Sequence, residues 1–341
     1  MVADRPLIAI TMGEPGGIGG EISIQAWERK RELSSVFFLL DCPKRIQKLA
    51  ASISKRCPVG IISEPDQAAE VFKTALPIIP LSYQINTEPG TSNFSDAKAV
   101  LESIDRAVMF AKANKIDGMV TNPIQKETLY QSGFAYPGHT EYLAEIAGTG
   151  RSVMMIASQN LRVVSVTTHL PIRQAIKSLT MDEILYSARV TRESLENFFG
   201  ILNPRLAVSG ANPHAGEGGF LGHEENQIIE PAVKILQAEG MDIFGPISAD
   251  SMFHERARNK YDAAICMYHD QALIPIKTLD FDASVNITLG ISIIRTSPDH
   301  GTAMDIAGKG NAKADSLIEA IELAGRVAIE KRKNSQRGKV R

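Results

Sequence analysis

The sequence is poor in the features that mark secreted, membrane-bound and disulfide-rich proteins. It has only three cysteines in 341 residues, at Cys42, Cys57 and Cys266, and their odd number and wide spacing exclude a disulfide framework or a cysteine-rich zinc module. No run reaches the roughly 18 apolar residues of a membrane span, and the first residues lack the long apolar stretch of a signal peptide. We therefore expect a cytoplasmic protein that does not associate with membranes.

The chain also lacks an excess of charge of one sign. It has 37 Lys and Arg against 39 Asp and Glu, a net charge of −2, which argues against nucleic acid or a membrane surface as the main partner. The exception is residues 331–341, which carry six basic side chains and no acidic one, so the rest of the chain carries −8. We expect this tail to be a frayed, solvated terminus rather than a contact for RNA or lipid.

What the sequence does contain is an alternation of β-rich and amphipathic segments. Nearly continuous apolar runs, such as VFFLL at 36–40 and AAICMY at 263–268, are typical of strands buried on both faces of a sheet. Residues 95–114 have apolar side chains at helical spacing, and Thr180 to Glu183 form a capping box. The alternation indicates an α/β fold with a mostly parallel sheet. The length suggests about two domains, and because no linker is visible they must share elements.

Three histidines each follow a predicted strand, at His169, His214 and His269. Ligand sites of open α/β sheets lie at the carboxyl ends of strands, and imidazoles suit zinc and similar divalent ions. Asp250 and Asp270 are candidates for carboxylates that orient an imidazole. Each histidine alone is better explained as a hydrogen-bonded loop residue. The three together predict a metal site.

Two further segments are candidate anion sites. GEPGGIGGE at 13–21 follows the first strand like a phosphate-cradling loop, although its spacing is neither GxGxxG nor GxxxxGK[ST], and a tight turn explains it equally well. In PGHTE at 137–141, His139 and Thr140 open a helix where free N–H groups attract anions. A simple N-cap role for Thr140 explains the same residues.

A third group of polar residues surrounds an apolar segment near the end of the chain. Lys277, Asn286 and Arg295 flank and interrupt it, and Lys and Arg in such a place suit phosphate or carboxylate groups. Lys277 would also be satisfied by Asp280 or Asp282. The following stretch, HGTAMDIAGKGN at 300–311, is a glycine-rich loop that suits a backbone-lined nucleotide pocket.

Eight motifs in this order resemble the 4-hydroxythreonine-4-phosphate dehydrogenases of pyridoxal 5′-phosphate biosynthesis along essentially the whole chain. They are ITMGEPGGIG, PGHTE, VTTHLP, GANPHAGEGG, GPISAD, MYHDQALIPIK, VNITLG and IRTSPDHGTAMDIAGKG. The last is also similar to the adenine-side loop of isocitrate and isopropylmalate dehydrogenases. The resemblance implies their fold, with two α/β/α domains and a central cleft rather than a Rossmann GxGxxG domain. We place the first, cofactor-side domain at 1–127 and 296–341, and the second, with metal, substrate and dimer contacts, at 128–295.

The resemblance also implies roles for individual residues. His169, His214 and His269 correspond to ligands of a divalent ion (zinc, magnesium or cobalt), two from one subunit and one from its partner in a homodimer. The implied substrate-binding set is His139, Thr140, Lys277, Asn286 and Arg295. The residues implied to bind NAD or NADP are Gly13, His300, Gly301, Thr302, Asp305 and Asn311. Lys277 and Asp250, the latter through a water, are our candidates for proton transfer.

The implied reaction is oxidation of 4-phosphooxy-L-threonine at C3, followed by decarboxylation to 3-amino-2-oxopropyl phosphate. A paralogous dehydrogenase of D-erythronate or D-threonate 4-phosphate would share the metal, the cofactor and the fold. A metal-dependent phosphohydrolase or a phosphate-binding protein, from a different class, would also use the glycine loop and the three histidines.

Overall fold

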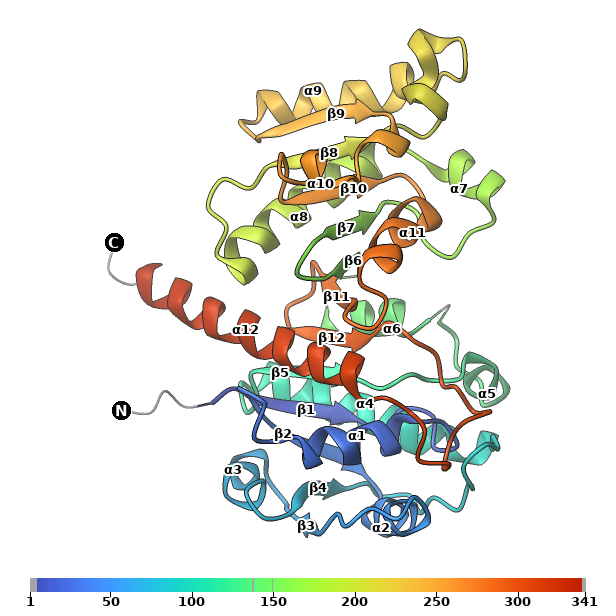
Figure 1. Ribbon diagram of the computed structural model, residues 1–341, viewed down its shortest axis with the longest axis vertical. Helices are drawn as coiled ribbons and strands as arrows, with labels where there is room; N and C mark the ends of the chain where they lie inside the picture. Colours follow the sequence, from blue (N-terminus) through green and yellow to red (C-terminus); the bar gives the residue numbers. More distant parts are fainter. Residues whose placement is uncertain (1–4, 137, 149, 339–341) are drawn as a thin grey trace. The chain divides into compact units, whose positions relative to one another are not determined.

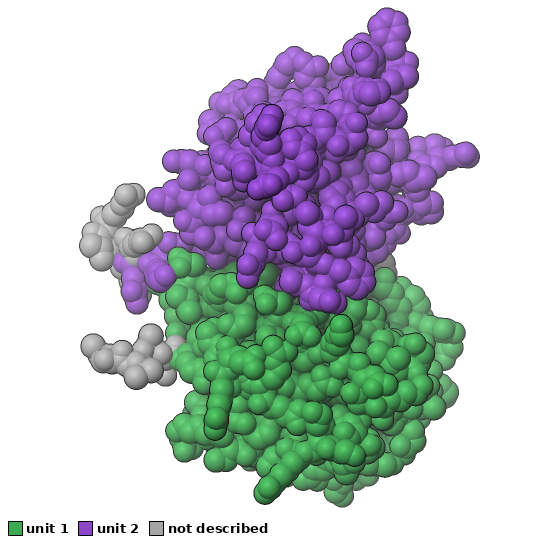
Figure 2. Space-filling model, viewed as in Figure 1, with its two compact units in different colours: residues 1–152, 291–332 green, residues 153–290, 333–341 purple. Residues whose placement is uncertain are grey.

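The structure is a computed structural model that describes residues 5–136, 138–148 and 150–338. The chain forms two compact units, Met1–Ser152 with Ile291–Arg332 and Val153–Gly290 with Lys333–Arg341 (Figure 2). The predicted first domain ended at residue 127, whereas the first unit continues through helices α5 (Lys126–Gln131) and α6 (His139–Ala147). These helices stay with it because Ser132 Oγ donates to the carbonyl of Phe94 at 2.9 Å and Lys112 Nζ donates to that of Ile146 at 2.7 Å.

In the described residues, the first unit is built on six parallel strands (Figure 1). In spatial order they are β3 (Val59–Ile61), β4 (Leu76–Pro80), β2 (Val36–Asp41), β1 (Leu7–Thr11), β5 (Gly118–Thr121) and β12 (Arg295–Pro298). The predicted apolar run at 36–40 is β2, and all its side chains are buried. Because the strands are parallel, their carboxyl ends and the loops that follow lie at one edge.

Helices cover both faces of this sheet. They are α1 (Gly19–Glu28), α2 (Pro43–Ser52), α3 (Ala68–Val71), α4 (Ala97–Lys112) and α12 (Asp315–Gly338). In Figure 1, α12 lies in front of the sheet and α4 behind it. The helix predicted at 95–114 is α4, whose buried face includes Val100, Ile104 and Val108 as the spacing indicated.

The described part of the second unit contains six strands in a mixed arrangement. Their spatial order is β11 (Val285–Leu289), β6 (Val153–Ala157), β7 (Arg162–Ser165), β10 (Ala263–Cys266), β8 (Leu206–Ser209) and β9 (Ile243–Ile247). β6 is antiparallel to both β7 and β11, and the other pairs are parallel. The prediction of an α/β fold with a mostly parallel sheet is therefore confirmed.

The helices of the second unit are α7 (Ile172–Ser178), α8 (Met181–Phe199), α9 (Glu230–Ala238), α10 (Glu255–Arg258) and α11 (His269–Leu279). The Thr180 hydroxyl accepts the Glu183 N–H at 3.3 Å and caps α8 as predicted, and Gly200 ends the helix in a left-handed conformation. A core of apolar side chains, among them Met154, Val163 and Ile276, lies between sheet and helices.

The carboxyl-terminal tail is helical rather than frayed as far as Gly338, because α12 continues to that residue, although the side chains of residues 331–333, 335 and 336 are exposed to solvent as expected. Arg332 donates to Asp117 Oδ1 at 2.6 Å, and the Asn334 amide donates to the carbonyl of Glu196 at 3.2 Å. These bonds fix the start of the basic segment. None of the helices in the described residues has the length and hydropathy that a membrane span requires.

Candidate functional site

Two of the three predicted metal ligands lie side by side in the second unit. His169 follows β7 and His269 opens α11 after β10, and β7 and β10 are parallel neighbours with Ser165 opposite Cys266. The Thr167 hydroxyl donates to the carbonyl of Met267 at 2.8 Å and holds the two strand ends together. The imidazole centroids of His169 and His269 are 5.7 Å apart. The sheet therefore brings together two side chains that are 100 residues apart in the sequence.

The neighbouring carboxylate gives His269 a defined orientation. Its Nδ1 lies 2.7 Å from Asp270 Oδ1, so the ring nitrogen that remains for a ligand is Nε2. Metal-binding imidazoles commonly have such a carboxylate on their other nitrogen. His169 has a φ of 52°, a left-handed backbone conformation that is uncommon outside glycine and is often found at functional sites.

The third predicted ligand, His214, lies on the long loop after β8. This loop contains the short helical segment η3 (Pro213–Gly219) and connects to α9 through the π-helical turn η4 (Glu225–Ile229). Over the described residues, no three His, Cys, Asp or Glu side chains of one chain come together as a metal site. His214 therefore does not join the pair formed by His169 and His269 within a single chain.

The other predicted site residues of the second unit occupy different elements. Lys277 lies on α11, with Nζ 5.8 Å from the centroid of the Phe281 ring. Asn286 lies on β11, and its Oδ1 is buried without a hydrogen-bond donor in the described structure. Asp250 is exposed in the turn after β9 and accepts a hydrogen bond from the Ser248 hydroxyl. A buried acceptor without a donor, as on Asn286, is uncommon in folded proteins and is often explained by a functional role.

Arg295 is a buried cation in the first unit, and only 4% of its surface is exposed. It begins β12, and its Nε and one Nη donate to the hydroxyl of Thr121 at the end of β5, at 3.0 and 2.6 Å. Burial lowers the pKa of Arg295 to about 10, so the guanidinium stays charged at neutral pH. A charge held at the carboxyl edge of the sheet is suited to an anionic group of a substrate.

The glycine-rich loop after β1 interlocks with the loop at 300–312. The Ile18 N–H donates to the carbonyl of Thr302 at 3.0 Å. An ideal Cβ at Gly16 would lie 1.7 Å from the Thr91 carbonyl oxygen, so this close approach of backbone to backbone requires glycine. Gly13 has a φ of 70°, and a Cβ there would lie 2.6 Å from the Cβ of Asn122. Both readings of the loop, as tight turn and as ligand cradle, agree with this geometry.

Glu21, a residue for which the sequence motifs predict no role, holds the predicted cofactor loop to α1. Its fully buried carboxylate accepts the N–H groups of Gly308 and Ala312, both at 3.0 Å. On the same loop, Asp305 and Asn311 are exposed, and no atom lies within 4 Å of a Cβ at Gly301. His300 has its Nε2 buried without a described partner. The loop thus has a backbone held in place by Glu21 and exposed polar side chains, an arrangement that is suited to binding a nucleotide.

Glu14 is a second residue that the sequence analysis missed. Its side chain is 2% exposed, and burial is the main cause that raises its pKa to about 7, although the Gly16 N–H lowers it. Its Oε1 has no hydrogen-bond partner in the described structure. The signal in the sequence was an acidic residue inside the glycine loop itself. A carboxyl group that titrates near neutral pH is typical of functional sites.

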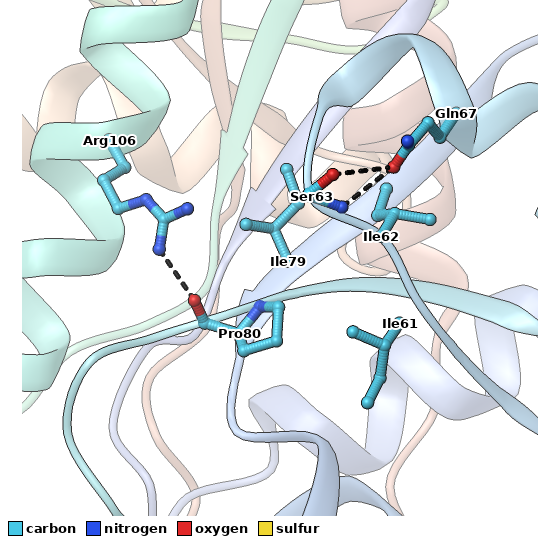
Figure 3. A pocket seen from close by; sticks show the side chains of 7 residues that line it. All are labelled: Ile61, Ile62, Ser63, Gln67, Ile79, Pro80 and Arg106. Atoms are coloured by element: carbon cyan, nitrogen blue, oxygen red, sulfur yellow. Dashed lines mark hydrogen bonds between the residues drawn. The ribbon is translucent and has the colours of Figure 1, made fainter.

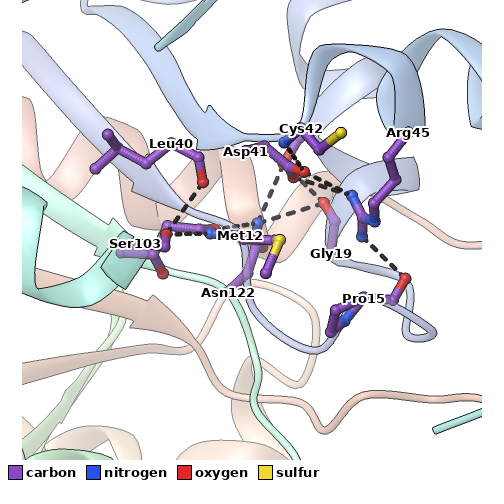
Figure 4. A network of polar contacts seen from close by, with 11 residues as sticks. Met12, Pro15, Gly19, Leu40, Asp41, Cys42, Arg45, Ser103 and Asn122 are labelled. Atoms are coloured by element: carbon purple, nitrogen blue, oxygen red, sulfur yellow. Dashed lines mark hydrogen bonds and ion pairs between the residues drawn. The ribbon is translucent and has the colours of Figure 1, made fainter. Parts of the chain in front are cut away.

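A buried polar network joins the glycine loop to the ends of the neighbouring strands (Figure 4). Asp41, at the end of β2, forms an ion pair with Arg45 at 2.9 Å, and Arg45 donates to the carbonyl of Pro15 at 3.0 Å. The Asn122 amide donates to the carbonyl of Thr11 at 3.0 Å. The ends of three neighbouring strands are thereby fixed relative to the loop.

A separate cavity of about 530 Å³ lies beside β3, β4 and α4 in the first unit (Figure 3). It is lined by Ile61, Ile62, Ser63, Gln67, Ile79, Pro80 and Arg106. Arg106 is already engaged with Glu102 and with the carbonyl of Pro80. None of the predicted site residues lines this cavity. The side chains of His139 and Thr140 lie outside the described part of the structure.

Comparison with known proteins identifies relatives along the whole chain. A family model described as "Pyridoxal phosphate biosynthetic protein PdxA" matches residues 35–324. The 4-hydroxythreonine-4-phosphate dehydrogenase of Bradyrhizobium diazoefficiens is 50% identical over 96% of this chain and 99% of its own length. A crystal structure of the enzyme of that name from Klebsiella pneumoniae has a TM-score of 0.84 and 36% identity, covering 96% of this chain and 99% of the other.

A more distant structure shares the same fold. Terephthalate 1,2-cis-dihydrodiol dehydrogenase from Burkholderia xenovorans has a TM-score of 0.64 and 26% identity, covering 94% of this chain and 98% of the other. The predicted α/β fold is confirmed by these similarities. They leave the individual site residues as predictions.

Proposed function

Since the chain belongs to the family of the pyridoxal phosphate biosynthetic protein PdxA, we propose that it is a 4-hydroxythreonine-4-phosphate dehydrogenase. In this proposal it oxidises 4-phosphooxy-L-threonine at C3 with NAD or NADP and releases carbon dioxide, giving 3-amino-2-oxopropyl phosphate. The observation that carries the proposal is the 50% identity over nearly the full length of a relative with that name. The arrangement of this chain's own polar residues supports it.

The metal site of the proposal combines two chains. We assign His169 and His269 of one subunit and His214 of the partner subunit as the ligands. The 5.7 Å separation of the first two rings and the Asp270 carboxylate on His269 Nδ1 fit a divalent ion bound through Nε2. When bound, the ion supplies Lewis-acid polarisation to the C3 oxygen of the substrate.

Exposed apolar side chains beside these histidines support a homodimer. Phe220 is 89% exposed in the loop of His214, Ile172 is 59% exposed just after His169, and Ile274 on α11 is 64% exposed. A surface of this kind is stabilised when a partner covers it. A second copy of the chain would bury these side chains and bring His214 of the partner subunit to the paired histidines.

The substrate's anionic groups require local cations because the body of the chain is acidic. Arg295, charged at neutral pH and hydrogen-bonded to Thr121, and Lys277 on α11 are the proposed partners of the phosphate and carboxylate groups. The unpaired Oδ1 of Asn286 would accept a hydrogen bond from the substrate's ammonium or hydroxyl group. His139 and Thr140 remain predicted members of this set.

Proton transfer from the C3 hydroxyl needs a base near the substrate. Lys277 and a water beside Asp250 remain the candidates, with Lys277 on the helix that His269 opens. The loops at 13–20 and 300–312, held together by the bond between Ile18 and Thr302 and by Glu21, are the proposed cofactor site. When bound there, the nicotinamide supplies the hydride acceptor.

The test is a parallel assay of reduced-nicotinamide absorbance with 4-phosphooxy-L-threonine, D-erythronate 4-phosphate and D-threonate 4-phosphate, each with NAD and with NADP. We expect the amino-acid phosphate to give the highest kcat/KM and to release carbon dioxide. A higher value with a sugar-acid phosphate would assign the chain to the paralogous reaction. Phosphate release without reduced cofactor would contradict the proposal in favour of a phosphohydrolase.

A further inference from the structure

The loop that carries His214 has an unusual backbone. Five consecutive residues from His214 to Gly218 have positive φ values between 43° and 77°, and three of them carry side chains. A left-handed conformation is unfavourable for every residue other than glycine. A run of this kind persists only when surrounding contacts enforce it.

The side chain that makes those contacts is Glu225. It is 2% exposed, and its Oε1 accepts the N–H groups of Ala211 and Asn212, both at 2.7 Å. Its Oε2 accepts the side-chain amide of Asn212 at 2.9 Å. One buried carboxylate thus binds both backbone N–H groups at the point where the loop leaves β8. Bonds of this kind to an ionised acceptor are about twice as strong as neutral ones.

The same carboxylate also lies against the middle of the left-handed run, at Gly216. An ideal Cβ at Gly216 would lie only 2.6 Å from Glu225 Oε2, so the loop folds back over the carboxylate and glycine is needed at this point. The Leu221 N–H donates to the Gly216 carbonyl at 3.1 Å and closes the turn. Glu225 therefore contacts the loop both before and after His214.

The local helix geometry places Glu225 there. It is the first residue of the π-helical turn η4. Such turns are rare in proteins, and many of those that occur lie at functional sites. The preceding Glu224 accepts the Asn212 amide at 2.7 Å and its own neighbour's N–H, that of His223, at 3.1 Å. These bonds lower the pKa of Glu224, the Asn212 amide most of all. Glu224 holds the side chain of Asn212, whereas Glu225 holds the backbone N–H groups of Ala211 and Asn212, just before His214.

We propose that Glu225 is a positioning residue that presents His214 to the metal site of the partner subunit. This inference rests on the proposed function, in which His214 is a metal ligand. Glu225 touches neither substrate nor cofactor in this scheme. It acts by fixing the left-handed loop, so that the imidazole is already oriented before the ion binds. Loss of a group that orients a ligand commonly weakens metal binding 10- to 100-fold.

The test compares Glu225→Gln with the matched surface variant Glu230→Gln, whose partner Lys234 is exposed. Zn²⁺ affinity is measured by calorimetry on the dimer, and Co²⁺ absorption reports the ligand geometry. We expect Glu225→Gln to bind Zn²⁺ about 10- to 100-fold more weakly with an altered Co²⁺ spectrum. Saturating metal should restore kcat. Glu230→Gln should match the wild type.

Two further variants keep the outcomes separate. If His214→Ala binds Zn²⁺ like the wild type, the proposed metal site is wrong, whatever Glu225 does. If His214→Ala loses the metal while Glu225→Gln stays within threefold of the wild type, the positioning role alone is wrong. Asn212→Ala removes one of the three bonds to Glu225 and should weaken Zn²⁺ binding by a smaller factor. If Glu225→Gln does not fold, Asn212→Ala serves as the test in its place. A Zn²⁺ affinity of Asn212→Ala equal to that of the wild type would then overturn the inference.

Discussion

At the scale of single residues, burial gives Glu14 a property that its place in the sequence does not reveal. The carboxyl group is enclosed by the glycine loop, and its pKa rises from 4.5 to about 7. Because the folded-state pKa lies above the unfolded value, the protonated form stabilises the fold. This contribution is complete below about pH 4.5 and is lost as the pH rises through about 7.

The first prediction follows from this shift. Between about pH 4.5 and 7 the free energy of unfolding should fall by up to about 3 kcal/mol through Glu14 alone. Glu14→Gln should lack this fall and so gain stability over the wild type at about pH 8, as measured by urea unfolding across the pH range. Glu88→Gln, an exposed residue, should keep the wild-type slope. Equal slopes in wild type and Glu14→Gln would refute the prediction.

A second residue-scale prediction concerns the buried guanidinium of Arg295. Thr121→Val keeps the shape of the side chain but removes the hydroxyl that accepts two of its hydrogen bonds. We expect the free energy of unfolding to fall by about 1.5–3 kcal/mol and the KM for the phosphorylated substrate to rise. Thermal unfolding and steady-state kinetics test this, with the exposed Thr74→Val as control. An unchanged KM would remove Arg295 from the proposed substrate site.

At the scale of elements, buried and exposed ion pairs of α2 differ in what they contribute. Arg45→Met leaves the carboxylate of Asp41 buried without its cation, and burial already raises the pKa of that group. We expect a loss of about 3–5 kcal/mol in unfolding free energy. Lys48→Met on the same helix removes only an exposed pair with Glu88 and should cost less than about 1 kcal/mol. Similar losses in both would contradict the role of burial.

Sequence patterns identified elements where apolar spacing or capping chemistry is local. The strand at 36–41 and the helix opened by Thr180 are present because their signals lie within a few neighbouring residues. β12 was not predicted, since Arg295–Pro298 contains a cation, two hydroxyl side chains and a proline. Its burial depends on β5, which is far away in the sequence.

The candidate site was predictable to a similar extent. The motifs identified His169 and His269, and the parallel pairing of β7 with β10 explains why they meet. The roles of Glu21 and Glu225 could not be predicted from the sequence. Both side chains act through hydrogen bonds to backbone N–H groups that come close to them only in the folded chain. Glu21 and the Gly308 N–H that it accepts are 287 residues apart in the sequence.

At the scale of the whole molecule, the proposed metal site makes each subunit depend on the other. His169→Ala and His214→Ala should each be inactive alone. Mixed from unfolded chains, they should regain about one quarter of the wild-type activity, since half of random dimers are mixed and each has one intact site. Steady-state assay of the refolded mixture tests this. No recovery, with dimers present by light scattering, would place all three histidines of a site in one chain.

The pairing of β6 with β11 has a consequence for how the chain is made. Val153 lies opposite Leu289, so the inserted segment 153–290 begins and ends on adjacent strands of its own sheet. Synthesis proceeds from the amino terminus, and β12 and most of α12, which belong to the first unit, emerge after the whole of residues 153–290. The sheet of the first unit is therefore completed only after residues 153–290 have been synthesised, and this inserted segment can close its own sheet while the first unit is still unfinished.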